Sequence, residues 1–181
     1  MANIEHQEQL DVVDKVSVVL YRMAWVVVTL SFGWASYSGA YQHSIWQPLW
    51  LLAVGCSLLA HNLHIYNKLI RYLVAACGWL ALWLTMSYYL WHWPFMAMFS
   101  LGAFYAVIGA LAYKESFCFN LGLLRWMPLL LVADWVLSLG DWQALRVVSL
   151  LLAAIGCLLI AYHKIKQPLY YDIGKRSHYQ L

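Results

Sequence analysis

The residues best suited to chemistry occur in two short polar motifs of an otherwise apolar chain. The first motif, Ala60-His61-Asn62-Leu63-His64, has two imidazoles three residues apart, and Ser57 precedes them by one turn. On a helix, these three side chains would share one face. The second motif, Lys114-Glu115-Ser116-Phe117-Cys118, adds a carboxylate and a thiol. We expect the motifs to meet in a polar groove, whose candidate ligand-binding residues are Ser57, His61, His64, Glu115 and Cys118.

Imidazole, thiolate and carboxylate groups are also the ligands that transition metals such as zinc prefer. We expect His163 at the same end of the protein, so the candidate metal ligands are His61, His64, Glu115, Cys118 and His163. A b-type haem between His163 and one of the other two histidines is a further alternative. The spacing matches no known metalloenzyme motif, such as HExxH or CxxC. No cofactor is therefore predicted, and the simplest interpretation is a hydrogen-bonded polar rim.

Signatures of catalysis are missing from the sequence. It has no GxSxG nucleophile elbow, no glycine-rich phosphate loop and no histidine cluster like that of membrane desaturases. Intramembrane proteolysis would need a second acid in a stretch next to that of Asp134, and the sequence has none there. We therefore expect that the protein is not an enzyme.

Asp134 is the clearest ionisable residue inside an apolar stretch, where a charge is costly and usually has a partner. It precedes the turn at Gly140 and Asp141 by about two helical turns. A residue equally far beyond the turn, on the following helix, lies at the same depth in the membrane as Asp134. Arg146 is at about that position. We predict an ion pair between Asp134 and Arg146 that locks the last helical hairpin. The alternatives are that Asp134 relays a proton or a substrate, or that it faces an outer cavity.

The composition indicates which elements must position these residues. Hydrophobic residues make up 64% of the 181 residues and charged residues 10%, and the mean hydropathy is +0.65. These values lie outside the range of soluble globular domains. Six apolar stretches, each long enough to cross a bilayer as a helix, occupy residues 19–38, 48–66, 70–91, 94–113, 121–139 and 143–162. The predicted fold is an all-α bundle of six transmembrane helices, with a kink at Pro128 in the fifth.

The distribution of charge predicts the orientation of this bundle. Six crossings place ten of the eleven Lys and Arg residues on one side, and Arg146 on the other. The positive-inside rule puts the basic side in the cytoplasm, with an acidic N-terminal tail at 1–18 and a basic C-terminal tail at 163–181. Tryptophans near the opposite helix ends form an aromatic belt: Trp34, Trp46, Trp50, Trp91, Trp93, Trp135 and Trp142. No signal peptide is predicted, because the first 15 residues are polar and acidic.

Small residues indicate how the helices pack against one another. Cys56 with Ala60, and Ala153 with Cys157 and Ala161, form stripes at four-residue spacing, which allow helices to approach closely in lipid. We therefore expect the cysteines to pack rather than to form disulfides. Three helices followed by three would be inverted in topology, but the two halves share no motif that aligns by eye.

The predicted partner is the lipid bilayer. Basic residues between Lys164 and Arg176 alternate with tyrosines, a pattern that suits an anionic membrane surface better than nucleic acid. The broad apolar faces suit a single bundle, a homo-oligomer or a larger membrane complex equally well, so all three remain open.

The two polar motifs also resemble those of a known family. The stretches His61 to Lys68 and Lys114 to Asn120, the latter followed by Leu121 to Pro128, are similar to a family of uncharacterised prokaryotic integral membrane proteins known only as a domain of unknown function. The resemblance implies a multi-pass protein of the bacterial inner membrane, and it implies no activity. It also implies that the part most similar to the family contains Lys114, Glu115, Cys118 and Phe119.

Three function classes follow from these observations. The first is a protein that binds or transports a small molecule or ion through the polar groove, with a water-filled path from the cytoplasm towards Asp134. The second is a structural or assembly subunit of a membrane complex, for which short loops and small-residue stripes suffice. The third is a redox protein with bound metal or haem. We favour the first class.

Overall fold

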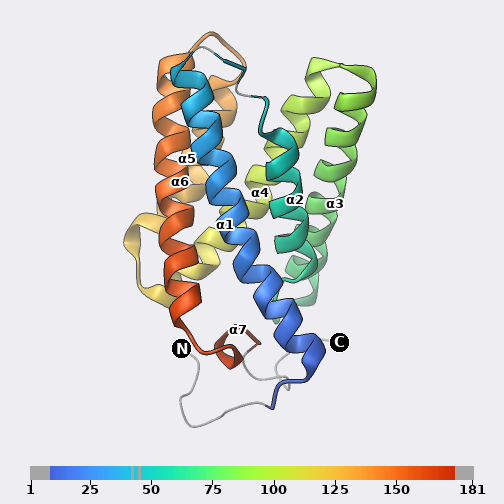
Figure 1. Ribbon diagram of the computed structural model, residues 1–181, viewed down its shortest axis with the longest axis vertical. Coiled ribbons are helices and arrows are strands. Elements are labelled where there is room, and N and C mark those ends of the chain that lie inside the picture. Colours follow the sequence, from blue (N-terminus) through green and yellow to red (C-terminus); the bar gives the residue numbers. More distant parts are fainter. Residues whose placement is uncertain (1–8, 42, 45, 174–181) are drawn as a thin grey trace.

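The structure is a computed structural model that describes residues 9–41, 43, 44 and 46–173. Within these residues the chain forms helices and no strand, so the predicted all-α fold is confirmed for this part (Figure 1). The elements are α1 (Val12–Ala40), α2 (Leu49–His61), α3 (Lys68–Trp91), α4 (Pro94–Phe119), the 3-10 helix η1 (Gly122–Trp126), α5 (Met127–Leu137), α6 (Gln143–Lys166) and α7 (Tyr170–Ile173). We call the end of the bundle that carries α7 the α7 end, and the end with the α5–α6 turn the far end.

Four helices are long and apolar enough to cross a bilayer. α1, α3, α4 and α6 have 29, 24, 26 and 24 residues, with mean hydropathies of 1.6 to 2.5 over their most apolar windows. α2 and α5 have 13 and 11 residues, fewer than the ~20 that a straight crossing needs. Large apolar side chains such as Leu73, Trp83 and Leu90 are exposed on α3. An exterior of this kind suits contact with lipid.

The second helix is shorter than predicted. It ends at His61, and the Leu58 carbonyl accepts hydrogen bonds from both the backbone N–H and the side-chain amide of Asn62, at 3.1 and 2.9 Å. Asn67 then caps α3 by accepting a hydrogen bond of 3.1 Å from the Ile70 amide. The residues between these two asparagines form a non-helical connection.

The kink predicted at Pro128 is wrong. η1 precedes α5, and Pro128 is the second residue of α5, where its missing N–H leaves no helical hydrogen bond unmade. The start of α5 packs against α4 at Gly109, where an added Cβ would lie 3.3 Å from the Pro128 Cα. The fifth helix is therefore short, with Pro128 in its first turn, and the 3-10 helix η1 leads into it.

Three other helices extend beyond their predicted bounds. α1 begins at Val12, because Asp11 and Asp14 form a capping box. α4 continues through the second polar motif to a left-handed cap at Asn120, with φ of 53°. α6 continues to Lys166, so part of the segment predicted as a basic tail is helical. The remainder of that segment from residue 174 lies outside the described residues.

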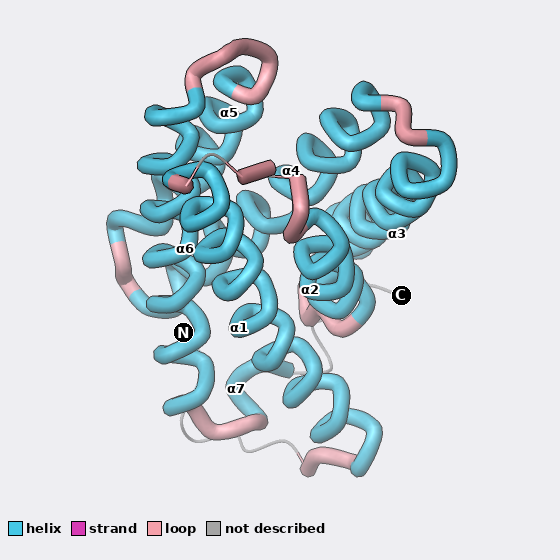
Figure 2. The backbone as a smooth tube through the Cα atoms, turned by 45° about the horizontal axis from the view of Figure 1, so that its top comes forward, coloured by secondary structure: helices cyan, strands magenta, loops and turns pink. Residues whose placement is uncertain are grey.

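The two halves of the chain follow one plan in opposite directions. α1–α3 and α4–α6 each consist of a long, a short and a long helix, and α1 begins at the α7 end whereas α4 finishes there (Figures 1 and 2). In each half the short helix packs against both long ones, and α1 packs on α6 as α4 packs on α3. The match is incomplete, since α2 and α6 also touch α4. Such an arrangement is typical of an inverted repeat.

A few residues correspond once the helices of the two halves are paired. Arg71 and Arg146 are each the fourth residue of a helix of 24 residues, α3 and α6. The run Leu51-Leu52-Ala53-Val54-Gly55 on α2 corresponds to Leu129-Leu130-Leu131-Val132-Ala133 on α5. These identities are too few to reveal the repeat without the helix pairing.

α2 and α3 approach each other closely at Gly78. A Cβ added there would lie 2.4 Å from the Ala60 Cβ, closer than two carbon atoms in contact can come. The two helices therefore touch because residue 78 has no side chain, as small residues permit in membranes.

Gly78→Ala should lower the free energy of unfolding by about 1–3 kcal/mol, the usual cost of overpacking. Adding Ala60→Gly should restore most of that loss, because it vacates the same space. Thermal unfolding in a mild detergent measures both effects. Gly33→Ala is the matched control, since a Cβ there meets nothing within 4 Å. Equal losses from Gly78→Ala and Gly33→Ala would contradict the packing described here.

Candidate functional site

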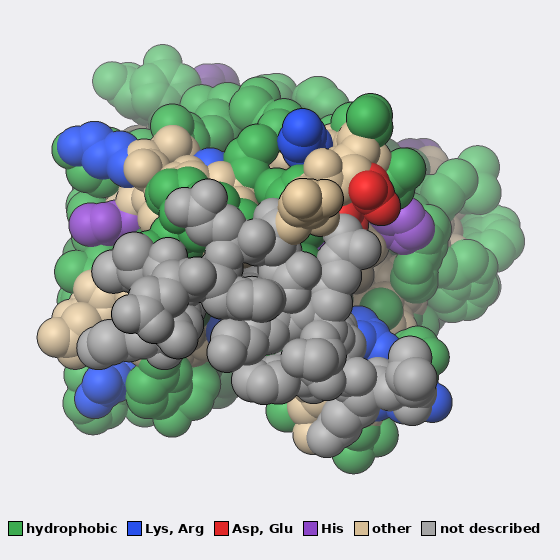
Figure 3. Space-filling view, turned by 90° about the horizontal axis from the view of Figure 1, so that it is seen from below, with side chains coloured by type: hydrophobic (Ala, Val, Ile, Leu, Met, Phe, Trp, Pro, Cys, Tyr) green, Lys and Arg blue, Asp and Glu red, His purple; other side chains and the backbone are tan. Residues whose placement is uncertain are grey.

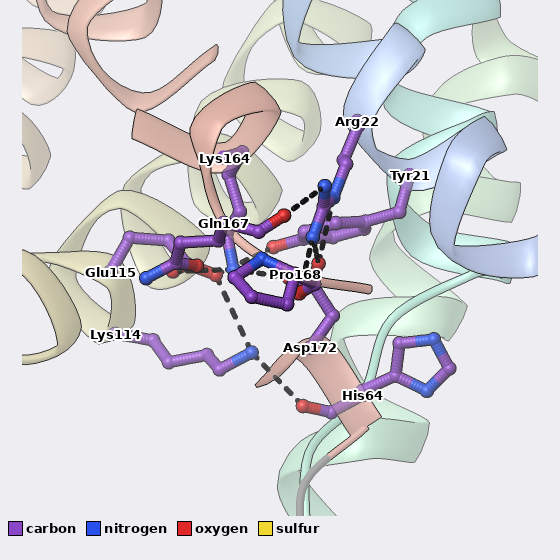
Figure 4. A network of polar contacts seen from close by, with 9 residues as sticks. All are labelled: Tyr21, Arg22, His64, Lys114, Glu115, Lys164, Gln167, Pro168 and Asp172. Carbon is purple, nitrogen blue, oxygen red and sulfur yellow. Dashed lines mark hydrogen bonds and ion pairs between the residues drawn. The ribbon is translucent and has the colours of Figure 1, made fainter. Parts of the chain in front are cut away.

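Glu115 is fully buried at the α7 end, where α1, α4 and α6 meet (Figure 4). Its Oε1 accepts a hydrogen bond of 3.0 Å from the Tyr21 hydroxyl, and its Oε2 lies 2.9 Å from Lys164 Nζ. Lys114 Nζ is 3.5 Å from Oε1. A buried carboxylate keeps its charge only with partners of this kind, because desolvation opposes ionisation.

Asp172 of α7 joins the same group of charges. Its Oδ2 accepts hydrogen bonds from Arg22 Nε at 2.8 Å and Nη2 at 2.6 Å, and its Oδ1 lies 2.5 Å from Lys164 Nζ. Arg22 also donates to the Gln167 carbonyl at 2.7 Å and the Pro168 carbonyl at 3.0 Å. Lys164 thus bridges two carboxylates, and α7 is fastened to α1 and α6. We call this group the ionic cluster; it consists of Tyr21, Arg22, Lys114, Glu115, Lys164 and Asp172.

Sequence reasoning identified Glu115 as a candidate but missed its main partners in the ionic cluster. Lys164 and Asp172 fall in the segment predicted as a tail, yet they are 3% and 8% exposed. The signal that could have found the cluster is Arg22, a charge in the interior of the apolar helix α1, since such a charge is expected to have a partner.

His64 lies in the connection between α2 and α3. Its carbonyl accepts a hydrogen bond of 3.0 Å from Lys114 Nζ, while its Nε2 has no hydrogen-bond partner among the described residues. Burial and then the positive charge of Lys114 lower the pKa of His64 to about 4. The imidazole is therefore neutral at physiological pH, and Figure 4 shows it directed away from the ionic cluster.

The helical face expected for Ser57, His61 and His64 does not form, because α2 ends at His61. The exposed ring of His61 packs edge-on against Trp79, with ring centroids 6.3 Å apart. Ser57 is half-buried, and its hydroxyl has no hydrogen-bond partner in the described part of the chain. These residues therefore line the α7 end without converging on Glu115.

The candidate metal ligands are likewise dispersed. Cys118 is exposed on α4, whereas Glu115, one turn earlier, is buried. The ring of His163 packs against Phe119, with centroids 5.1 Å apart. Over the described ranges, no three His, Cys, Asp or Glu side chains are grouped so that they could hold a metal ion.

Asp134 is the centre of a second buried cluster, at the far end, between α4, α5 and α6. Its Oδ2 accepts a hydrogen bond of 2.6 Å from the Tyr105 hydroxyl, and its Oδ1 accepts one from the Ser149 hydroxyl. Arg146 Nη2 lies 3.6 Å from Oδ2. The structure thus brings Asp134 and Arg146 together. Sequence reasoning gave no indication of Tyr105, because it lies on α4, outside the hairpin of α5 and α6. It gave no indication of Ser149, because that residue lies on an apolar face of α6.

Arg146 is less completely partnered than Asp134. The residue is 6% exposed, but its Nε has no hydrogen-bond partner among the residues described. Its contact of 3.6 Å with Asp134 is longer than a hydrogen bond. The guanidinium also lies 5.4 Å from the centroid of the Trp46 ring, a cation–π contact. Arg146 lines both an internal cavity of about 20 Å³ and an open recess of about 370 Å³.

Comparison with known proteins finds relatives of this chain. The model of a family described as uncharacterized integral membrane proteins, DUF2301, matches residues 58–181. An uncharacterized protein of Haemophilus influenzae is 30% identical over 185 residues, which cover 100% of both chains. No solved structure matches. The predicted resemblance to such a family is therefore confirmed, and the matched residues include Glu115, Asp134 and Arg146.

Asp134→Asn and Arg146→Gln should reduce stability non-additively. Each single change leaves one buried charge without its partner, at a typical cost of about 3–5 kcal/mol. The double variant should lose at least about 1 kcal/mol less than the sum of the two. Unfolding in detergent measures all three values. Arg125→Gln, at an exposed residue of η1, is the control and should add to Asp134→Asn; the same additivity for Arg146→Gln would disprove the coupling.

Stability should decrease as the pH falls from 6.5 towards 4, because in this range the unfolded chain binds a proton at His64 that the folded chain does not. The decrease attributable to His64 is at most about 3 kcal/mol. His64→Asn should flatten this part of the pH profile of thermal unfolding, whereas His61→Asn, at an exposed position, should retain it. The charges that bear on His64 are those of Lys114, Asp172, Asp14 and Lys164. An unchanged profile in His64→Asn would refute the assignment.

Proposed function

Because the chain belongs to the DUF2301 family of uncharacterised integral membrane proteins, we propose that it binds a small molecule or ion and transports it across the bacterial cytoplasmic membrane. In this proposal the protein crosses the membrane six times, with α2 and α5 as short crossings and both termini in the cytoplasm. Lys and Arg side chains around the α7 end (Figure 3) support this orientation, since the positive-inside rule places such an end in the cytoplasm. The bacterial relative supports the location.

The inverted arrangement of the two halves is the observation that carries the proposal. Inverted repeats are typical of secondary transporters, in which one half moves against the other and exposes a central site to each side in turn. In those proteins, short or interrupted helices at matching positions in the two halves hold the substrate or the coupling ion. α2 and α5 are the short helices at matching positions here.

Asp134 is the proposed centre of the transport site. It is 1% exposed on the short helix α5, and it is held by Tyr105, Ser149 and Arg146. Ionisable residues within a membrane bundle are costly, and they commonly mark the route of a substrate, ion or proton. The cavity of about 20 Å³ beside Arg146 has room for one water molecule.

The polar residues of the α7 end form the cytoplasmic side of the proposed path. These are the predicted groove residues Ser57, His61, His64, Glu115 and Cys118. Ser57 Oγ and His64 Nε2 are buried without hydrogen-bond partners among the described residues, as expected for groups that are hydrated in another conformation. Glu115 is held by Lys164 and Tyr21, so opening on this side requires the ionic cluster to loosen.

A ligand screen by thermal unfolding tests the proposed function. The purified protein is unfolded in mild detergent in the presence of a panel of inorganic ions, amino acids, organic acids and sugars. A true ligand at about 100 times its Kd stabilises the folded state by about 2.7 kcal/mol and should raise the Tm by several degrees. Asp134→Asn should abolish the shift. Asp11→Asn is the matched control, because asparagine also caps a helix well, and it should keep the shift.

The same preparation identifies the outcomes that would overturn the proposal. A protein that responds to no compound and co-purifies stoichiometrically with another membrane polypeptide would be a structural or assembly subunit. A coloured or metal-containing preparation would indicate the redox class. A ligand whose effect persists in Asp134→Asn would refute the proposed site.

A further inference from the structure

An open recess lies at the far end, beside the α5–α6 turn. Its volume is about 370 Å³, which falls in the range of sites for small organic ligands. Among the described residues, its lining is mostly polar and includes Trp46, Ser138, Asp141, Gln143 and Arg146. In the orientation proposed above, it faces the outside of the cell.

Arg146 is the residue of the recess that requires a further partner. Its side chain is 8% exposed, and its Nε makes no hydrogen bond with any described residue. Guanidinium groups carry five N–H donors and no acceptor, so a buried one without enough acceptors has an energetic deficit. Asp134 and Tyr105 remove this deficit only in part, because the contact of Arg146 Nη2 with Asp134 Oδ2 is 3.6 Å and neither residue bonds Nε.

A carboxylate group in the recess would supply acceptors to the part of the guanidinium that lines it. It offers two acceptor oxygens in the plane and at the spacing of the guanidinium fork. The Trp46 ring, 5.4 Å from the guanidinium, forms part of the same wall and limits where the fork can turn. Other donors on the wall are partly engaged, since Gln143 Nε2 donates to the Gly39 carbonyl at 2.8 Å. Arg146 is therefore the dominant anchor.

We infer that the recess at the α5–α6 turn binds the carboxylate group of a small molecule through the Arg146 guanidinium. The inference rests on the proposed transport function and names the substrate class for it. Asp141 lies on the wall of the same recess. A zwitterion, such as an α-amino acid, would place its ammonium near Asp141, whereas a simple monocarboxylate would not use that residue.

Titration of the purified protein with sodium acetate and with glycine, at constant ionic strength, tests the inference. We expect a saturable rise in Tm with at least one of them. Arg146→Lys should weaken binding at least about tenfold, because an ammonium cannot form the two parallel hydrogen bonds. Arg125→Lys, at an exposed arginine, is the matched control and should keep the wild-type affinity. Asp141→Asn should weaken the binding of glycine but not of acetate if the ligand is a zwitterion.

Loss of folding must be separated from loss of binding. The double variant Asp134→Asn/Arg146→Gln removes both charges of the pair, so no buried charge remains unpaired, and it should fold but show no response to either carboxylate. Unchanged affinity in Arg146→Lys would overturn the inference. A wild-type protein that does not respond to acetate or glycine, but is stabilised in an Asp134-dependent way by a compound of the panel without a carboxylate, would also overturn the inference. The proposed function would then stand. A protein that no compound stabilises would overturn both.

Discussion

Lys164 lies between two buried carboxylates, 2.9 Å from Glu115 and 2.5 Å from Asp172, and so joins α4 to α6 and α7. In a membrane, burial of apolar surface does little to bring helices together, because lipid is as apolar as the protein. Ion pairs and hydrogen bonds between particular side chains must then determine which helices pack together. Each charge of the ionic cluster is tolerated only if its partners are in place, so the cluster permits few alternative packings of α1, α4 and α6.

The two buried clusters are built from the same kinds of group but differ in how fully these are satisfied. Each contains a tyrosine hydroxyl, a carboxylate and a cation: Tyr21, Glu115 and Lys164 at the α7 end, and Tyr105, Asp134 and Arg146 at the far end. Lys164 makes two short ion-pair contacts, whereas the ion-pair contact of Arg146 with Asp134 is long, and Arg146 borders a cavity and a recess. The far end is consequently the one that can respond to a solute without first breaking a complete set of ion pairs.

Hydropathy predicts much of this fold, because apolar length is a property of contiguous residues. The long helices α1, α3, α4 and α6 follow from it, as does the matching depth of Asp134 and Arg146, which needs only one tight turn between them. The end of α2 at His61 does not, because apolar residues continue beyond it at Leu63 and Ile65. The burial of Lys164 does not follow from hydropathy either, because a lysine near the end of an apolar run is predicted to be solvent-exposed unless its carboxylate partner is known.

The candidate sites show the same division between local and distant information. The second polar motif drew attention to Glu115, but its hydroxyl partner Tyr21 is 94 positions away. The inverted arrangement of the helices is hidden for a related reason: the two halves share the order of long and short helices and few of the same side chains. The position of α7 late in the sequence has a consequence for biosynthesis and membrane insertion. Arg22 and Glu115 enter the membrane early in synthesis, whereas Lys164 and Asp172 emerge from the ribosome late, so the nascent chain must hold these charges hydrated or shielded until its last helices arrive.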